Sequence, residues 1–340
     1  MNNIDTLLRD AVVEYCATIG KDPLLVQGAG GNVSWKDGDT LWVKASGTWL
    51  ADAKVKDIFV PVDLRDLQDE IKTGNFSVLP KVNSDSKLRP SIETLLHALM
   101  PHRVVVHVHA IEALAYLVRE NAENEIRQKL SSLNQWAIVN YQKPGAPLSK
   151  AVAEILAKSP DAHILLLQNH GVVIGGNDIV EVETKLNQLL SELRGGHIDV
   201  GDKAFPESIC IGNTHEYLPV DILGIHNMVI DPFLFSRVES DWALYPDHVV
   251  FLGQRANCYD SVPALEEDLN SNTVHELVFV KGLGVFAKAA FGIAKQVQLK
   301  CYFDVIVRQP KHVSLKVLDE QEIAQLLNWD AEQYRQQIAK

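Results

Sequence analysis

The chain has 340 residues, of which 46% are apolar and 22% are charged, and its formal net charge is −12. These values are typical of a globular protein and leave enough length for one large domain or two modest ones. The acidic balance, with no Lys/Arg-rich run, argues against a surface that gathers nucleic acid or anionic lipid, so we expect no nucleic-acid and no membrane partner.

Cysteine spacing and the lack of targeting signals indicate a cytoplasmic protein. The four cysteines lie far apart, without the short spacings of zinc fingers or redox motifs, and are expected to be free thiols. The first ten residues are polar and amphipathic, unlike a secretory signal. No apolar run approaches the roughly 20 residues that a membrane-spanning helix needs.

Helical and strand patterns alternate over the first two-thirds of the chain, which predicts a layered α/β domain. A glycine-rich turn over residues 27–35 precedes the first expected strand. The expected elements are, in chain order, an opening helix from Ile4, a strand over 40–45, a helix over 91–100, a strand over 103–109, helices over 110–120 and 149–158, a strand over 163–168 and a helix over 179–193.

A domain boundary is expected between Gly195 and Val220, where the pattern gives way to glycine, proline and mixed polar residues. The sequence thus predicts a first domain over residues 1–200 and a smaller C-terminal α/β domain over residues 215–340.

The C-terminal stretch contains an apparent echo of the first domain. Residues 245–254 can be laid over residues 100–109, and residues 278–286 over residues 165–173, with every histidine replaced by another residue. The second domain is therefore either a degenerate, metal-free relative of the first or a chance likeness between strands that end in glycine turns.

Three histidines occur where strands would bring them together. Successive side chains of a strand point to opposite faces, so His107 and His109 can share one ion if Val106 and Val108 face the core. His170 stands where an apolar strand opens into a glycine turn, the edge at which layered α/β proteins carry their sites. A lone histidine is more often a core residue, but three in this arrangement predict a metal site with a position open for substrate.

Glu93 falls at the start of the helix expected over residues 91–100, where the helix dipole favours a carboxylate. It can act as a fourth metal ligand, as a base, or as both in turn. A nearby cation would lower its pKa and burial would raise it, so the sequence does not decide its charge.

Five short motifs follow one another along the chain: Gly31-Asn32-x-Ser34, Ser46-Gly47, Ser91-x-Glu93, His107-x-His109 and Asn169-His170-Gly171. In this order they resemble the signature of the class II aldolase/adducin family, which includes fuculose- and rhamnulose-phosphate aldolases and ribulose-phosphate 4-epimerase. The resemblance covers roughly residues 5 to 195.

The resemblance implies a three-layer α/β/α class II aldolase-like domain followed by the smaller C-terminal α/β domain. It implies a zinc-dependent aldolase that makes or breaks a carbon–carbon bond in a small sugar, sugar phosphate or sugar-acid substrate through a metal-stabilised enediolate. By the same analogy the chain is expected to form a homo-oligomer, such as a tetramer.

Residue roles follow from the resemblance position by position. Glu93 resembles the catalytic acid/base that moves the proton at the enediolate carbon. The metal ligands would be His107, His109 and His170, binding Zn²⁺ or, alternatively, Mn²⁺ or Co²⁺. A phosphate cradle of turn amides and side chains, which needs no basic residue, would comprise Gly31, Asn32, Ser46, Gly47 and Ser91.

Several points depart from the family pattern or stay open. Ile92 replaces the second of two serines that usually precede the glutamate, so substrates with a carboxylate or without a phosphate become plausible. His97 can support Glu93 or simply bond within the core. The family's tyrosine acid, often from a neighbouring subunit, is not placed, and the candidates are Tyr116, Tyr141 and Tyr217.

Other activities on the same fold are an epimerase, a dehydratase or a decarboxylase. Glu93 favours lyase chemistry, because the family's epimerases carry an aspartate at that position. A non-enzymatic scaffold, as the adducins are, is the remaining alternative, and the complete set of three histidines and a glutamate argues against it.

Overall fold

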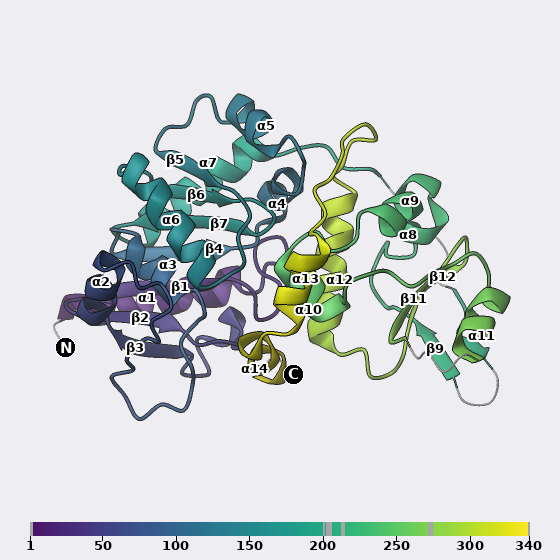
Figure 1. The fold of residues 1–340 in the computed structure, drawn as a ribbon, viewed down its shortest axis with the longest axis horizontal. Coiled ribbons are helices and arrows are strands. Elements are labelled where there is room, and N and C mark those ends of the chain that lie inside the picture. Colours follow the sequence, from purple (N-terminus) through teal and green to yellow (C-terminus); the bar gives the residue numbers. More distant parts are fainter. Residues whose placement is uncertain (1–2, 200, 202–205, 212–214, 271–274, 339–340) are drawn as a thin grey trace.

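The computed structural model describes residues 3–199, 201, 206–211, 215–270 and 275–338. Its first part is built on a seven-stranded mixed sheet in the order β3-β2-β1-β4-β7-β6-β5, in which β5 and β6 run parallel and the other neighbours antiparallel (Figure 1). The strands are β1 (Asn32–Asp37), β2 (Thr40–Lys44), β3 (Phe59–Asp63), β4 (Val104–Val108), β5 (Trp136–Val139), β6 (Ile164–Leu167) and β7 (Gly171–Gly176).

Helices cover both faces of this sheet. On β4, Val106 and Val108 pack on one face with side chains of α1, α4, α5 and α7, whereas Val105 packs on the other with α3 and α6. The helices are α1 (Asn3–Ile19), α2 (Leu64–Lys72), α3 (Thr94–Leu99), α4 (Ile111–Leu117), α5 (Ala122–Lys129), α6 (Ala146–Lys158) and α7 (Ile179–Leu193), with a 3₁₀ turn η1 (Leu50–Asp52). The predicted three-layer α/β/α fold is confirmed.

A second, five-stranded sheet in the order β10-β11-β12-β9-β8 lies in the C-terminal part, as the predicted fold class requires. Its strands are β8 (Ile209–Ile211), β9 (His215–Pro219), β10 (Cys258–Tyr259), β11 (Leu277–Val280) and β12 (Gly284–Ala287). The short helices of this part are α8 (Asn227–Ile230), α9 (Pro232–Ser240) and α11 (Val262–Asn270). The predicted limits of the two domains, 1–200 and 215–340, stay predictions.

The apparent echo of the first domain is wrong for the first of its two stretches, residues 245–254. Residues 245–254, laid over β4, form the helix α10 (Pro246–Leu252), which begins with a proline at a position where helices tolerate it. His248 is fully buried in that helix. The other half does correspond, because β11 and β12 pair antiparallel as β6 and β7 do.

The helices α10, α12 (Ile293–Ile306), α13 (Glu320–Leu327) and α14 (Asp330–Ile338) lie between the two sheets in Figure 1. One apolar cluster runs from Ile111 and Leu114 of α4 to Leu299 and Tyr302 of α12 and on toward the second sheet. The C-terminal part is therefore packed directly on the first.

The structure bears on the predictions of free cysteines and of a chain without membrane-spanning helices. All four cysteines are free, and Cys16 and Cys301 are buried. Among the described residues, no helix combines the length and the apolar character needed to cross a bilayer.

Candidate metal centre

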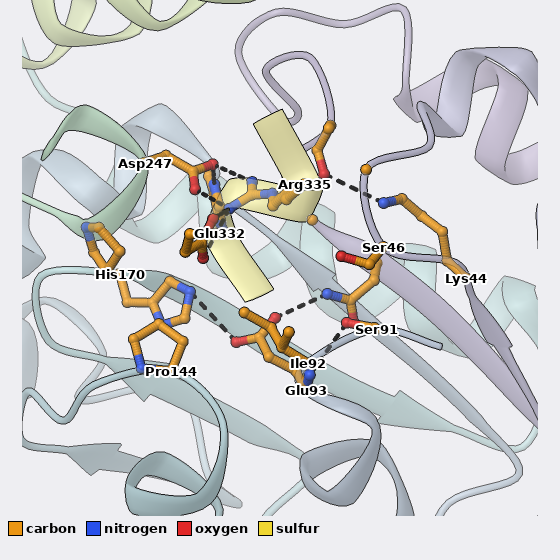
Figure 2. A pocket seen from close by; sticks show the side chains of 16 residues that line it. Lys44, Ser46, Ser91, Ile92, Glu93, Pro144, His170, Asp247, Glu332 and Arg335 are labelled. Carbon is orange, nitrogen blue, oxygen red and sulfur yellow. Dashed lines mark hydrogen bonds and ion pairs between the residues drawn. The ribbon is translucent and has the colours of Figure 1, made fainter. Parts of the chain in front are cut away.

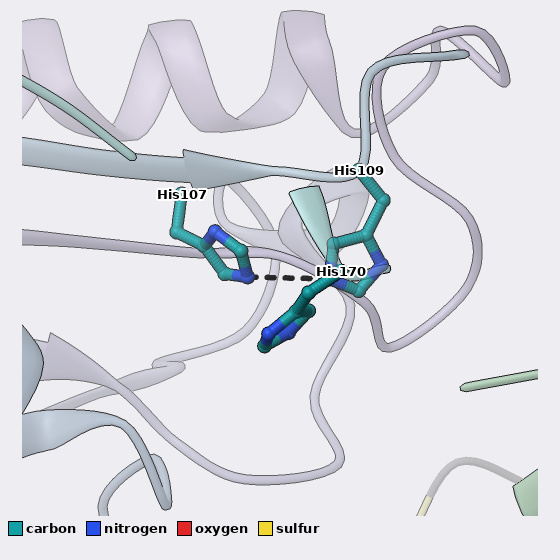
Figure 3. A group of neighbouring side chains, drawn as sticks. All are labelled: His107, His109 and His170. Carbon is teal, nitrogen blue, oxygen red and sulfur yellow. Dashed lines mark hydrogen bonds between the residues drawn. The ribbon is translucent and has the colours of Figure 1, made fainter. Parts of the chain in front are cut away.

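Three buried histidines meet where strands β4, β6 and β7 of the large sheet begin or end (Figure 3). His107 lies in β4, His109 follows that strand directly, and His170 lies in the turn between β6 and β7. One ring nitrogen from each lies within 4.8 Å of the others. Val106 and Val108 face the core, the condition on which the predicted grouping depended.

The hydrogen bonds of two of these rings aim their free nitrogens at each other. His107 Nδ1 lies 2.9 Å from the carbonyl oxygen of Val172, and His109 Nδ1 lies 3.3 Å from Asp247 Oδ2, so each Nδ1–H has an acceptor. The two Nε2 atoms then present lone pairs to one another across 3.2 Å. Because lone pairs repel, a cation bound beside both atoms would relieve this contact.

Glu93 completes the donor set. Its Oε1 lies 3.4 Å from His170 Nε2 and its Oε2 lies 3.5 Å from His107 Nε2. A tetrahedral ion with bonds of 2.0–2.1 Å holds its ligand atoms about 3.3–3.4 Å apart, close to these separations. Three imidazole nitrogens and one carboxylate oxygen are thus placed to hold a divalent metal.

The charge states of the group suit metal binding. Burial lowers the pKa of His107, and it lowers the pKa of His170 to about 3, which keeps both rings neutral near pH 7. Burial would raise the pKa of Glu93, but the imidazoles of His107 and His170 and a hydrogen bond from Asn32 outweigh it and lower the value to about 2. Neutral imidazoles beside a carboxylate are the states in which these groups coordinate metals.

A buried chain of polar contacts holds Glu93 in place. Asn32 Nδ2 donates to Glu93 Oε2 at 2.8 Å, and Asn32 Oδ1 contacts His97 Nε2. The other nitrogen of His97 lies 2.7 Å from Ser34 Oγ. His97 therefore supports Glu93 through Asn32, which is the first of its two predicted roles. Glu93 Oε1 has no hydrogen-bond partner among the described residues.

The five residues of the expected phosphate cradle line one cavity with Glu93, His109 and His170: Gly31, Asn32, Ser46, Gly47 and Ser91. Their backbone amides are less available than expected, because Ser46 N donates to Arg89 O and Ser91 N donates to Lys44 O. The phosphate-binding role of these residues stays a prediction.

Basic and acidic side chains that the sequence did not single out also line this cavity (Figure 2). Lys44, at the end of β2, is buried, and its burial with Arg335 nearby lowers its pKa to about 7. Asp247 comes from α10, and Glu332 and Arg335 come from α14. The C-terminal part therefore forms one wall of the site.

Two glycines let the histidines pack closely. Gly31 has φ +62°, and a Cβ there would lie 2.8 Å from His107 O. A Cβ on Gly171 would lie 2.6 Å from Val108 O and 3.0 Å from a carbon of the His109 ring. Any larger residue would push the strands or the rings apart, which explains both glycines physically.

The histidine cavity is small, and a larger one adjoins it. The histidine cavity, which also borders Ser46, Ser91 and Arg335, has a volume of about 30 Å³ and is partly open. The adjoining cavity, about 670 Å³, shares Ser46, Ser91 and Ile92 with it and has Trp329, just before α14, and Tyr334 of α14 in its wall. Helix α14 thus separates the metal position from the wider space.

The candidate acid tyrosines lie elsewhere. Tyr116 stacks under Arg119, Tyr141 is buried in the apolar cluster between the two parts, and Tyr217 donates to His275 O in the second sheet. Among the described residues, the tyrosine that borders this region is Tyr334, in the adjoining cavity.

Comparison with known proteins gives one family. The family model described as Class II Aldolase and Adducin N-terminal domain matches residues 10–189. An uncharacterized oxidoreductase of Bacillus subtilis, YuxG, is 31% identical over 219 residues, covering 60% of this chain but only 31% of that protein. An L-fuculose phosphate aldolase of Methanocaldococcus jannaschii is 28% identical over 175 residues, covering 49% of this chain and 84% of the relative. A solved N-terminal class II aldolase domain from Thermoplasma acidophilum is 26% identical, with a TM-score of 0.46, over 54% of this chain and 91% of that one.

Proposed function

The chain belongs to the class II aldolase and adducin family, and from this premise we propose that it is a zinc-dependent aldolase acting on a small sugar, sugar phosphate or sugar acid. The observation that carries the proposal is the position of Glu93. Its Oε1 makes no hydrogen bond among the described residues and lies 3.4 Å from His170 Nε2 at the wall of the cavity, where it could act as a base on a substrate.

The reaction needs a proton carrier and a stabiliser of negative charge. A divalent cation held by His107, His109 and His170 supplies Lewis acidity that lowers the energy of charge on the substrate oxygens. In the synthetic direction the Glu93 carboxylate removes a proton from the carbon next to the carbonyl, the enediolate carbon attacks an aldehyde, and the aldehyde oxygen takes up a proton to become the product hydroxyl. In cleavage that hydroxyl loses its proton, the aldehyde leaves, the bond's electron pair stays on the enediolate, and Glu93 returns the proton to carbon.

The cavity favours an anionic substrate. Lys44, a buried basic residue, lines the cavity together with Ser46 and Ser91. An anion bound there would raise the pKa of Lys44 from about 7 and hold the lysine in its charged form. Because Ile92 supplies no hydroxyl, a carboxylate or a phosphate bound by few hydroxyls suits this site best.

We also propose assembly as a homo-oligomer, such as a tetramer. No tyrosine of the described chain lines the histidine cavity, so a second copy could supply the group that takes the hydroxyl proton in cleavage and returns it to the aldehyde oxygen in synthesis. Light scattering coupled to size-exclusion chromatography would measure the assembly state, and a monomer would contradict this part of the proposal.

The first experiment measures metal content and retro-aldol activity together. Wild-type protein should contain near-stoichiometric zinc, and His107→Ala should lose it because one of three ligands is gone. Glu93→Gln should keep most of the metal while cleavage falls by at least about a hundredfold, since the proton carrier is lost. Substrates would be ketose and keto-acid phosphates and their unphosphorylated forms.

His312→Ala is the matched control, because His312 is exposed and lies outside the cavity, and it should behave as wild type. A metal-free wild type that added zinc does not activate would contradict the aldolase and favour an adducin-like scaffold. Zinc binding without cleavage of any substrate would favour the epimerase, dehydratase or decarboxylase alternatives.

A further inference from the structure

We infer that Asp247, in the C-terminal part of the chain, is a positioning residue of the metal centre, which orients His109 and is itself held by Arg335 of α14. The inference rests on the metal site of the proposed function. It adds a residue outside the stretch that matches the family model, which ends at residue 189.

The contacts of Asp247 point in two directions. Toward the histidines, its Oδ2 lies 3.3 Å from His109 Nδ1. Away from them, Arg335 donates to both carboxylate oxygens, with Nη1 2.5 Å from Oδ1 and Nη2 2.8 Å from Oδ2 (Figure 2). Gln298 Nε2 adds a contact to Oδ2 at 3.3 Å. Only 3% of Asp247 is exposed, so water contributes little to holding this carboxylate.

A carboxylate that accepts a hydrogen bond from the ring nitrogen facing away from the metal changes how a histidine binds that metal. It fixes the tautomer with the proton on Nδ1, so that Nε2 carries the lone pair, and it makes that nitrogen more basic. In His109 this Nε2 is the atom that faces His107. Asp247 therefore aims and strengthens a ligand without touching the metal position itself.

The glycine turn before β1 leaves room for this contact. A Cβ on Gly30 would lie 3.0 Å from His109 Nδ1 and 3.1 Å from Asp247 Oδ2, so a side chain at this position would press on both atoms at once. The turn in the first part of the chain is thus shaped around a carboxylate from the second.

A purely structural role for the pair is the competing explanation, since a buried Arg–Asp pair can simply dock a helix. The chain offers a matched pair for comparison. Arg237 Nη1 lies 2.6 Å from Asp241 Oδ2, both residues are buried in the C-terminal part, and neither lines the histidine cavity.

The test compares zinc affinity in neutralised forms of the two pairs. Full-length protein is stripped with a chelator and titrated with Zn²⁺ against a chromophoric competitor. Asp247→Asn and the double variant Asp247→Asn/Arg335→Gln should bind zinc about 10- to 100-fold more weakly than wild type. Substitution by Co²⁺ should also shift the visible absorption bands, because the His109 ligand is less firmly oriented.

The control is the double variant Asp241→Asn/Arg237→Gln, which should keep wild-type affinity and the wild-type Co²⁺ spectrum. The double variant at Asp247 and Arg335 leaves Glu332, whose Oε2 lies 3.3 Å from Arg335 Nη1, as a buried carboxylate without its partner. The triple variant Asp247→Asn/Arg335→Gln/Glu332→Gln removes that charge as well, so it decides the question if the other two variants fold poorly. Circular dichroism verifies the fold of each.

Folded variants at Asp247 whose zinc affinity stays within about threefold of wild type would overturn the inference. An equal loss in the control would also overturn it, because the effect would then belong to C-terminal packing in general. A wild type that binds no zinc rejects the metal site itself, whereas zinc-binding variants equal to wild type reject only the role of Asp247.

Discussion

Lys44 carries a buried positive charge at the end of a strand that is otherwise apolar. Its ammonium group donates to the carbonyl oxygens of Ala29 at 3.2 Å and of Ala45 at 3.5 Å, and 2% of the residue is exposed. Neutral carbonyls compensate a buried cation only in part. Such a residue lowers the stability of the empty protein and is useful when an anion arrives.

Replacing Lys44 by methionine should change how stability depends on pH. Burial lowers the pKa from 10.5 in the unfolded chain to about 7 in the folded one. Below pH 7 both states are protonated and the folded state bears the full cost of the charge. Between pH 7 and 10.5 the unfolded state binds more protons, so wild-type stability rises with pH, by up to about 1.4 kcal/mol per unit.

Urea unfolding of wild type and Lys44→Met at pH 7, 8 and 9 measures this effect as the difference between the two proteins. The variant's relative advantage should be largest at pH 7 and shrink as the pH rises. A difference that stays constant over this range would mean that the lysine is not desolvated in the folded state.

Sequence reasoning found the residues whose spacing is local and missed those brought in by tertiary structure. The period of a strand is enough to group His107 with His109, and the order of the motifs adds Glu93 and His170. Lys44 left a faint signal, a lone charge in an apolar strand. Arg335 left none, because it lies among polar residues of a helix that reads as solvent-exposed.

Helix α14 closes the metal site through contacts along its whole length. Trp329, just before it, lies under Lys143 at 4.2 Å, and Tyr334 lies under Arg89 at 4.4 Å. At its end, Ile338 packs on Gly47, a turn residue with φ +80°. The absence of a side chain at position 47 is what allows the helix to approach the turn.

Gly47→Ala should loosen α14. A Cβ there would lie 2.6 Å from Ile338 Cβ and 3.1 Å from Arg335 O, so the helix end must move. Hydrogen–deuterium exchange of residues 330–338 should speed up several-fold. The left-handed conformation forced on alanine at this position alone costs about 1–2 kcal/mol of stability, measured by urea unfolding.

Gly74→Ala is the matched control for this change, since Gly74 also has φ +80° but nothing lies within 4 Å of its added Cβ. It should lose a similar backbone contribution to stability and leave exchange in α14 unaltered. Equal exchange in both variants would show that the turn does not hold the helix.

Elements with a clear period were predicted correctly, and α10 was not. The strands β4 and β6 and the helix α7 match the ranges expected from their patterns. In α10 the run Val249 to Phe251 suggested a strand, but the helix is buried from Pro246 to Phe251, with the polar Asp247 and His248 included. A helix that is buried all round lacks the 3.6-residue alternation of apolar and polar residues that would distinguish it from a buried strand.

At the scale of the whole molecule, one apolar cluster joins α4, which packs on the first sheet, to α12 and to β11 and β12 of the second sheet. The sequence predicted a boundary between residues 200 and 215 but could not show how closely the parts would pack, because the contact involves side chains far apart in the chain. Asn169 strengthens the junction, with its side-chain amide donating to Leu244 O at 2.8 Å and Lys316 O at 2.7 Å.

The two sheets should therefore unfold together. In urea, exchange-monitored unfolding of β4 and of β11 should have the same midpoint. Leu299→Ala, which removes a fully buried side chain of α12, should lower both midpoints equally, at a cost of about 2–5 kcal/mol. Two separate midpoints, or a shift confined to the second sheet, would show independent domains.

Helix α14 follows the residues of the metal site in the sequence, so it is synthesised after them. A ribosome adds about 5–20 residues per second, so Glu93 and the three histidines emerge seconds to tens of seconds before Arg335. During that interval the nascent sheet can take up its metal from open solution. Once α14 has docked, Glu332 and Arg335 form part of the wall of the cavity beside the ligands. A protein refolded without metal and supplied with it afterwards would have to admit the ion past a helix that the nascent chain had not yet made.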